Sequence, residues 1–452
     1  MEMLGLYPLF YVPEFGSAWL MGLTGSIHIM ASHTSVGAAL LFAFLAHKAY
    51  KEDRPELYDY MKKYGMFLLI FSYVIGSITG PGIWYTATAA SPRGISALIH
   101  NFVWVWATEW VFFVYEVLGV FALIYFMDKI DRKTHLKLTY TFAIASVGTL
   151  ALIIGIISFM MWPGTSAYYA TGSASDAFFG INTFPHMFLR IGFMIMMSGI
   201  IGLIISSAMR KENKALSIEL TKKMGWVSFL GGAVTLFFFM WYVMTLPENA
   251  HALLGKAKDE IVLNRIILAI LFSVYFLMAI VKPQWISRSL AIAMMFIIGI
   301  VGVWPGEKLR ETMRKPWVAG QYMYSNQIVG KDVAGKGIKD ETPILVKHGL
   351  LKVNPWIPDR LRTITPENKL EVGKLLVRIS CSNCHSLENT GKYRPLMPLA
   401  GPMGEVGLKA YMKGVIGTGS SPYMPKIALP DNEYDAMAAW IASEYNNKGA
   451  TK

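Results

Sequence analysis

The sequence is poor in charged residues and has almost no cysteine. Only 16% of its 452 residues are charged, while 54% are apolar; a soluble domain of ordinary composition carries about 25% charged residues. This deficit excludes a disordered chain and argues against a single soluble globule. The two cysteines, Cys381 and Cys384, are separated by only two residues, so they cannot form a disulfide framework. The composition instead predicts a polytopic membrane protein.

Eight stretches are long and apolar enough to be transmembrane helices, which need about 20 mostly apolar residues. The first 17 residues lack a positively charged region, so they do not read as a cleavable signal peptide. We therefore predict an all-α domain over residues 1–305, a transmembrane bundle of about eight helices. The predicted spans lie at roughly 18–46, 64–86, 97–127, 137–162, 185–208, 224–246, 261–281 and 287–305.

Lysine and arginine gather on one side of the predicted bundle. The connections that follow odd-numbered helices hold nearly all of these residues, and the opposite connections hold only Arg93, Lys256 and Lys258. By the positive-inside rule the N-terminus lies outside, and eight crossings return the chain to the outside after about Trp304. The net charge of +12 is thus first a topology signal and does not require a nucleic acid partner. We expect a multi-pass protein of the bacterial inner membrane, with both the N-terminus and the C-terminal region in the periplasm.

The character of the sequence changes after Pro305. Residues 306–365 are rich in Lys, Gly and Pro and predict an extended periplasmic connector. Residues 366–452 predict a small all-α domain that closes with an amphipathic helix from Asp431 to about Tyr445. Asp431 can cap the free backbone N–H groups at the start of this helix.

Cys381-Ser-Asn-Cys384-His385 has the pattern of covalent c-type haem attachment. In that chemistry two thiols add to the two haem vinyl groups, and the adjacent imidazole lies under the iron as the proximal ligand. A zinc site would need further ligands in a suitable cluster, and the chain has no other cysteine. A redox dithiol would not need His385. The motif therefore predicts one covalent haem c.

The second axial ligand of such a haem is often methionine, which raises the reduction potential. Met424 stands in the proline-constrained stretch Ser-Pro-Tyr-Met-Pro and is the predicted ligand, with Met397 and Met403 as alternatives. Met437 lies inside the closing helix and is predicted to be core. A Gly-Lys-x-Leu helix, the haem motif, a Met-Pro loop and an Ala-x-Trp helix follow in this order, and the segment resembles a class I cytochrome c.

Four histidines lie within or near the outer halves of predicted spans. His28 and His33 are in the first span, His100 is near the outer end of the third, and His186 opens the fifth. Ionisable residues inside spans are costly and are functional candidates. A lone membrane histidine is more often a hydrogen-bonded packing residue than a ligand. Several of them beside a haem domain favour ligation of b haem iron by His28 and His186, with His33 and His100 as additional candidates.

Glu109 and Glu116 are seven residues apart in the third span, so two helical turns place them on one face. Two interpretations stay open with equal weight. They are either hydrogen-bonded packing carboxylates or groups for proton transfer beside a haem.

Over roughly residues 18–317 the order of these elements resembles subunit I of the cytochrome bd quinol oxidases. Gly-Leu-Thr-Gly-Ser-Ile-His28 is similar to the family helix whose histidine binds a haem of the active-site cluster. Glu109 and Glu116 resemble the family's paired-glutamate helix, although Glu109 is one residue out of register. Phe184-Pro185-His186 resembles the helix that carries the histidine ligand of the low-spin b haem.

The last two pieces of the resemblance lie nearer the C-terminal region. Arg265, in Asn-Arg-Ile-Ile, looks like an arginine near the low-spin haem. Arg314-Lys315-Pro316-Trp317 is similar to the family's Gly-Arg-Gln-Pro-Trp signature, which implies a cofactor-binding role for Arg314 and Trp317. The resemblance implies one or more b haems, expected to be two, and a quinone as substrate or bound ligand.

The sequence also departs from that family. The family's methionine ligand would fall at Ile267 and a glutamate ligand at Trp304, and neither side chain can serve as the expected ligand. The quinol-binding loop shrinks to about residues 246–259, and the haem c region replaces a ninth helix. These departures put the oxygen-reducing pair of haems in doubt.

We therefore expect a membrane electron-transfer protein, or an oxidoreductase of the quinol:cytochrome c type, that connects the quinone pool to a periplasmic cytochrome. Quinol is expected near the outer face, beside His186 and the loop from Glu248 to His251. Two alternatives stay open. One is a terminal reductase of oxygen or a nitrogen oxide; the other is a non-catalytic, haem-bearing anchor of a larger complex, with a second membrane subunit possible in any case.

Overall fold

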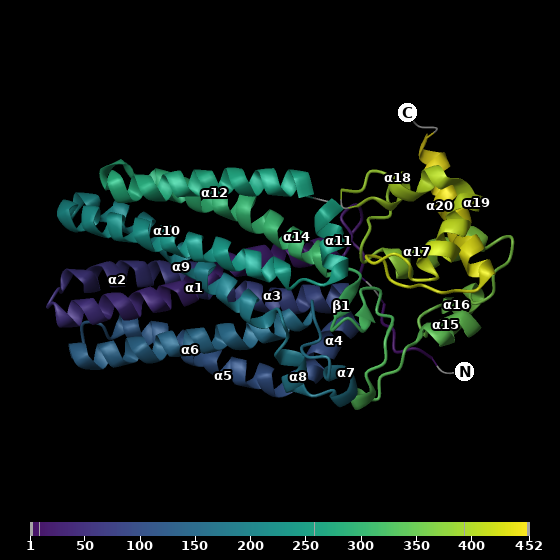
Figure 1. Cartoon of the computed structure of the whole chain (residues 1–452), viewed down its shortest axis with the longest axis horizontal. Helices are drawn as coiled ribbons and strands as arrows, with labels where there is room; N and C mark the ends of the chain where they lie inside the picture. The colour runs from purple at the N-terminus through teal and green to yellow at the C-terminus, as the bar shows by residue number, and fades with distance from the viewer. Residues whose placement is uncertain (1–2, 9, 257, 393, 450–452) are drawn as a thin grey trace.

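The computed structural model describes residues 3–8, 10–256, 258–392 and 394–449. Long helices form a bundle, and a smaller helical region sits at one end of it (Figure 1). Within the described ranges, eight helical segments are long and apolar enough to cross a membrane. The predicted all-α polytopic bundle is confirmed.

Each span is a single helix or a helix interrupted by a wider, π-helical turn. Four short helices connect them at the end nearest the C-terminal region: α4 (Pro92–Asn101), α7 (Tyr168–Thr171), α8 (Ala174–Phe178) and α11 (Glu248–Lys256). The spans are α1 (Ala18–Lys51), α2–η1–α3 (Glu56–Leu68, Leu69–Val74, Ile75–Ala90), α5 (Val103–Tyr125), α6 (Arg132–Phe159), α9 (Thr183–Ala208), α10 (Lys214–Met244), α12 (Lys258–Val281) and α13–η4–α14 (Arg288–Ile297, Ile298–Val303, Trp304–Arg314).

Local sequence explains where several spans begin. The side chains of Asp131, Asn213 and Ser287 each accept a hydrogen bond from a backbone N–H in the first turn of α6, α10 and α13. Such caps satisfy donors that have no partner inside the helix. All three caps lie at the lysine-rich end of the bundle.

Small residues let neighbouring spans approach closely. A Cβ on Gly231 of α10 would lie 2.4 Å from the backbone nitrogen of Met196 in α9, a separation that only glycine permits. Small residues at helix interfaces are typical of membrane bundles. The core of the bundle contains large buried side chains, among them Phe42, Tyr60 and Tyr64.

The structure differs from the sequence prediction at two ends of spans. The eighth span continues to Arg314 instead of ending near residue 305, because its charged residues pair with one another inside the protein. His100 lies in the separate helix α4 and not in the long third span, because the backbone breaks from helical geometry at Phe102, with φ −128°.

The C-terminal region has its own apolar core. Helix α17 packs against α20 so closely that a Cβ on Gly373 would lie 2.0 Å from the carbonyl oxygen of Ala436. Met437 is buried in this core, as predicted. The region contains the antiparallel pair β1 (Trp317–Ala319) and β2 (Met323–Tyr324), then α15 (Thr342–His348), α16 (Leu350–Val353), α17 (Lys369–Cys381), α18 (Leu396–Ala400), α19 (Gly404–Tyr411) and α20 (Asp431–Gly449).

Residues 306–365 contain more regular structure than the predicted extended connector. Their first part completes α14, and the remainder supplies β1, β2, α15 and α16. Leu345, Leu350 and Val353 belong to the C-terminal core. The apolar residues scattered between the Lys, Gly and Pro residues explain this packing.

The N-terminal segment crosses the C-terminal region before it enters α1. Leu4 and Leu6 are buried in the C-terminal core, and the Tyr11 hydroxyl donates a 2.5 Å hydrogen bond to the Glu388 carboxylate. The backbone N–H of Glu14 also donates to Glu388, at 2.9 Å. Both ends of the chain therefore lie at the same end of the bundle (Figure 1).

Candidate functional site

The Cys-x-x-Cys-His motif forms a tight turn at the end of α17. Nδ1 of His385 donates a 2.8 Å hydrogen bond to the carbonyl oxygen of Arg394. Because a carbonyl can only accept, this bond assigns the proton to Nδ1 and leaves the lone pair of Nε2 available. Metal-binding histidines are commonly oriented in this way. Burial raises the pKa of the Cys381 thiol to about 12 and lowers the pKa of His385.

The surroundings of the motif fit a covalently attached haem better than a zinc ion. Within the described ranges, no three His, Cys, Asp or Glu side chains gather into a possible metal site. The hydroxyl groups of Ser380, Ser382 and Ser386 are buried without a hydrogen-bond partner among the described residues. A haem would add polar groups and a large surface beside this turn.

The three predicted methionine ligands differ in environment. Met397 is fully buried in the C-terminal core, whereas Met403 is 42% exposed. Met424 is half-buried in the loop between α19 and α20. The assignment of Met424 to the iron stays a prediction, and it fits a side chain that is neither part of the packed core nor open to solvent.

The motif lies directly against the start of α1 and the end of α14. A Cβ on Gly16, two residues before α1, would be 3.4 Å from the carbonyl oxygen of Ser382 and 3.5 Å from that of His385. The Lys315 ammonium, one residue after α14, donates to the carbonyl oxygen of Asn383 at 3.4 Å. The C-terminal region is thus joined to the bundle at the motif itself.

His28 offers a free ring nitrogen in a glycine-lined space. The hydroxyl of Thr79 donates to the carbonyl oxygen of Ile75 at 2.8 Å, so its oxygen accepts from Nδ1 of His28 at 3.1 Å. Nε2 of His28 therefore carries the lone pair. A Cβ on Gly22 or Gly25 would meet nothing within 4 Å, so the same stretch of α1 has room for a planar group. This arrangement fits an axial haem ligand.

His33 and His186 lie in a different arrangement. Both use Nε2 to accept hydrogen bonds from the Arg190 guanidinium, at 3.2 and 3.1 Å. Their Nδ1 atoms contact the hydroxyls of Ser32 and Ser158, at 3.3 and 3.1 Å. With both ring nitrogens engaged, neither histidine fits an iron ligand in this arrangement. Their predicted roles as b haem ligands stay predictions that would require Arg190 to release them.

Arg190 connects these histidines to a row of charges on α14. Its guanidinium contacts Glu307 at 3.4 Å, and Glu307 in turn accepts from Arg310 at 2.7 Å. Arg314 donates to Glu311 at 2.6 Å. We call Glu307, Arg310, Glu311 and Arg314 the α14 charge row.

The sequence analysis missed Arg190 and most of the α14 charge row. Two signals could have revealed them. Arg190 follows His186 by four residues, and Glu307, Glu311 and Arg314 are spaced so that they share one helical face. The pattern on α14 was hidden because the predicted eighth span ended before the row began.

This cluster contains more buried cations than buried carboxylates. Among the described residues, the ion pairs of Arg190, Arg310 and Arg314 are made with Glu307 and Glu311, Lys315 adds a fourth cation, and all six side chains are largely buried. Burial lowers the pKa of the Lys315 ammonium. A buried charge is strongly disfavoured unless it is paired, so the excess calls for anionic groups.

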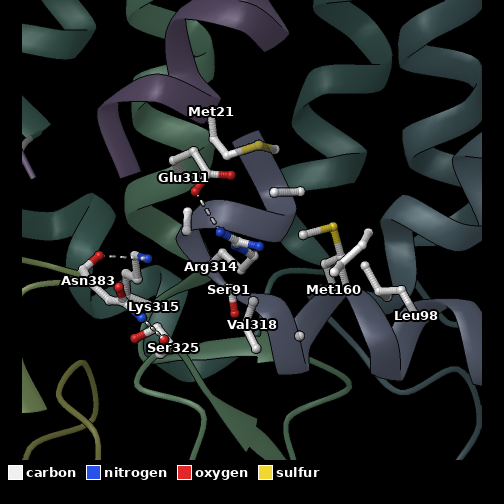
Figure 2. A pocket seen from close by; sticks show the side chains of 14 residues that line it. Met21, Ser91, Leu98, Met160, Glu311, Arg314, Lys315, Val318, Ser325 and Asn383 are labelled. Carbon is white, nitrogen blue, oxygen red and sulfur yellow. Dashed lines mark hydrogen bonds and ion pairs between the residues drawn. The ribbon is translucent and has the colours of Figure 1, made fainter. Parts of the chain in front are cut away.

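A cavity of about 60 Å³ lies where these cations meet the C-terminal region. Figure 2 shows Arg314 and Lys315 on one side and apolar side chains such as Met160 and Leu98 on the other. Nε of Arg314 and Oδ1 of Asn383 are buried without a hydrogen-bond partner among the described residues. The cavity has room for a small polar group such as a carboxylate.

The remaining candidates lie apart from this cavity. Glu116 is buried and accepts from the hydroxyls of Ser35 and Tyr73 at 2.7 and 3.2 Å, an environment that suits a packing carboxylate. Glu109 lies two turns away on α5 and is half-buried. The hydrogen bonds of Glu116 favour a structural role for it, and the role of Glu109 stays open.

Arg265, Trp317 and His100 each have local partners. Arg265 donates to the carbonyl oxygen of Gly302 at 2.8 Å, which joins α12 to η4. Trp317 stacks on Tyr324 with ring centroids 4.1 Å apart. His100 is exposed on α4, where its Nδ1 donates to the carbonyl oxygen of Ser96 at 2.9 Å.

No protein-family model and no curated protein matches this sequence. Among solved structures, the bd oxidase from Geobacillus thermodenitrificans is similar, with a TM-score of 0.55 and 16% identity. The similarity covers 68% of this chain and 89% of that chain. At this identity the likeness shows the fold alone, and it supports the predicted bd-like membrane helical bundle.

Proposed function

We propose that this protein carries electrons between the quinone pool and a periplasmic cytochrome, through one or more b haems in the bundle and one covalent haem c. The observation that carries the proposal is the contact between Gly16 and the backbone of His385. It places the haem c motif at the start of α1, and His28 lies about 15 Å further along the same helix at 1.5 Å per residue. Two candidate haem sites thus adjoin one helix.

The site geometry supports particular residues as those that would hold each group. Cys381, Cys384 and His385 would attach the haem c, with Met424 as the proposed second ligand, and His28 would hold a b haem. When bound, the haems supply reversible one-electron chemistry. The Arg394 carbonyl and Thr79 hold the two imidazoles in the tautomer that presents Nε2.

The excess cations would also stabilise negative charge on a bound haem at the outer end of the bundle. Arg314 and Lys315 lie beside the cavity where a haem carboxylate would meet a positive charge. Buried positive charge also favours the more reduced state of a nearby redox group, because it stabilises an added electron. Apolar side chains around the cavity exclude water and keep these interactions strong.

A steady-state assay tests the proposal with the full-length protein. Menadiol serves as the electron donor and an oxidised soluble c-type cytochrome as the acceptor, both observed by absorption. We expect catalysed reduction of the acceptor that depends on protein concentration. A preparation whose haem c is reduced by dithionite but transfers no electrons from menadiol would contradict the proposal.

The bd-like fold favours a second candidate function, a terminal reductase of oxygen or a nitrogen oxide. That function needs an open coordination position on a haem iron. Carbon monoxide difference spectra of the reduced protein would detect such a position. A spectrum without a carbon monoxide-binding haem would eliminate this candidate, and a clear carbon monoxide complex would favour it over simple electron transfer.

A further inference from the structure

A second cavity, of about 280 Å³, opens on the outer side of the bundle between α4 and the segment that follows β2. It lies apart from the cavity beside Arg314. Ala97, Met323 and Val329 form an apolar wall, while His100 and Lys336 supply polar groups. None of the haem sites described above uses this cavity or the imidazole of His100.

The polar groups of this cavity favour a neutral ligand. Because Nδ1 of His100 donates to the Ser96 carbonyl, Nε2 is left as an acceptor. Arg93 is neutralised by Glu341, with which it forms hydrogen bonds of 2.6 and 2.8 Å. One remaining ammonium, that of Lys336, gives too little positive charge to favour a phosphate over an uncharged head group.

The membrane-spanning helix α5 begins three residues after His100 and carries exposed apolar side chains at its start. Trp104 is 82% exposed and Val103 is 48% exposed at the start of this helix. Exposed tryptophan is typical of the membrane–water boundary. A ligand with a polar ring and a long apolar tail would therefore meet matching surfaces on both parts.

We propose that this cavity binds the head group of a quinol, with one hydroxyl donating to Nε2 of His100 and the tail leaving along Trp104. The inference rests on the proposed function and gives its quinol a location different from the expected one beside His186. His186 is buried with both ring nitrogens engaged, whereas His100 is exposed with one acceptor free.

The cavity is also close to the haem c motif. Met323 lines it, and Ser325 lies two residues further on, in the turn that follows β2, so at most about 7 Å of chain separates them. The Ser325 hydroxyl contacts the sulfur of Cys384 at 3.3 Å. A quinol in this cavity would thus lie near the thiol side of the motif, without a path through the bundle core.

Oxidation of the bound quinol to quinone breaks two O–H bonds and releases two electrons. One proton passes to Nε2 of His100, and the other passes to water at the open mouth of the cavity. The electrons would leave one at a time toward the Cys384 side of the motif, where a haem c held by Cys381, Cys384 and His385 would supply the one-electron oxidant. A periplasmic cytochrome would be the final acceptor of both electrons.

Two variants of the full-length protein test the site. His100→Leu removes the acceptor, and we expect KM for menadiol to rise about tenfold, the effect of one lost hydrogen bond. Ala97→Trp fills the cavity, and we expect it to abolish photolabelling of α4 by an azido-labelled short-chain quinone. His47→Leu is the matched control, because His47 is a histidine of α1 near the lysine-rich end of the bundle, and it should change neither result.

The outcomes separate the inference from the proposed function. Dithionite reduction of haem c in each variant shows that the protein is folded and loaded. Unchanged KM in His100→Leu, or labelling that maps away from α4 in a wild type that menadiol reduces, would overturn the inference and leave the proposed function standing. A wild type that is neither reduced by menadiol nor labelled would overturn both.

Discussion

Two regions of the same helix, α1, differ in whether their histidine has a free ring nitrogen. His28 has one nitrogen bound to Thr79, one nitrogen free and open space beside Gly22 and Gly25. One and a half turns further in, His33 shares the Arg190 guanidinium with His186, and no nitrogen is free. The comparison teaches that partners, more than residue type, separate a candidate ligand from a packing group. Arg190 and the α14 charge row make this difference.

The largest expected effect comes from removing each of the two histidines in turn. His28→Ala should remove one b haem from the purified protein, because it deletes the imidazole that presents Nε2. His33→Ala should retain that haem. Pyridine haemochrome spectra that count b against c haem measure the difference, and equal b haem contents in the two variants would contradict it.

Arg190→Met tests the part of the comparison in which both ring nitrogens of the histidine are engaged. Removal of the guanidinium leaves His33 and His186 without their donor and weakens the pairing of Glu307, and breaking a buried ion pair costs about 3 kcal/mol. We expect this loss in the free energy of unfolding measured in mixed micelles. Arg210→Met, at the opposite end of α9, is the control. An Arg190 variant as stable as the control would show that the cluster contributes no stability.

Glu433 extends the comparison to a buried carboxylate that has backbone donors instead of a cation. It accepts from the N–H groups of Leu350 and Leu351, and burial raises its pKa from 4.5 to about 7. The folded state therefore binds this proton more tightly than the unfolded state does. The stability that the protonated carboxyl provides is present below pH 4.5 and is lost as pH rises toward 7.

Glu433→Gln loses one of the two backbone hydrogen bonds at every pH but removes the ionisation, so its stability relative to the wild type should be about 3 kcal/mol more favourable at pH 8 than at pH 4. Denaturant titration of the full-length protein, followed by absorption of the covalent haem, measures both values. A stabilisation that is equal at the two pH values would mean that ionisation of Glu433 is not its cause.

The smallest expected effect concerns the excess cations. Lys315→Met should lower the reduction potential of the nearest haem by about 60 mV, which is a tenfold change for one electron. Lys308→Met is the control, since Lys308 is exposed on α14. A redox titration that gives the same shift for both variants would show that overall charge, and not the buried ammonium, sets the potential.

The resemblance of ordered motifs predicted the bd-like arrangement of the bundle, whereas composition and local spacing were enough to predict the eight spans and the closing helix that contains Met437. These features depend on hydrophobic length and period, which the sequence displays directly. The hydrogen-bond state of each histidine depends instead on residues far away in the chain. Nothing near His33 in sequence reveals that Arg190, on α9, occupies its Nε2.

The second group of missed features has a similar cause. The α14 charge row lies beyond the point where charged residues made the eighth span appear to end. Its residues are tolerated there because Glu307 and Glu311 pair with arginines inside the protein. Likewise, the contact of Ser325 with Cys384 joins residues 59 positions apart, so the cavity beside α4 could be placed near the motif only in three dimensions.

Anaerobic rapid mixing of the oxidised full-length protein with menadiol tests the central claim most directly. The account predicts that the absorption of both c-type and b-type haem changes to the reduced form, because the motif at His385 and the site at His28 adjoin one helix. A protein in which dithionite reduces the haem c but menadiol leaves it oxidised, or in which no b-type haem is detected at all, would contradict the account.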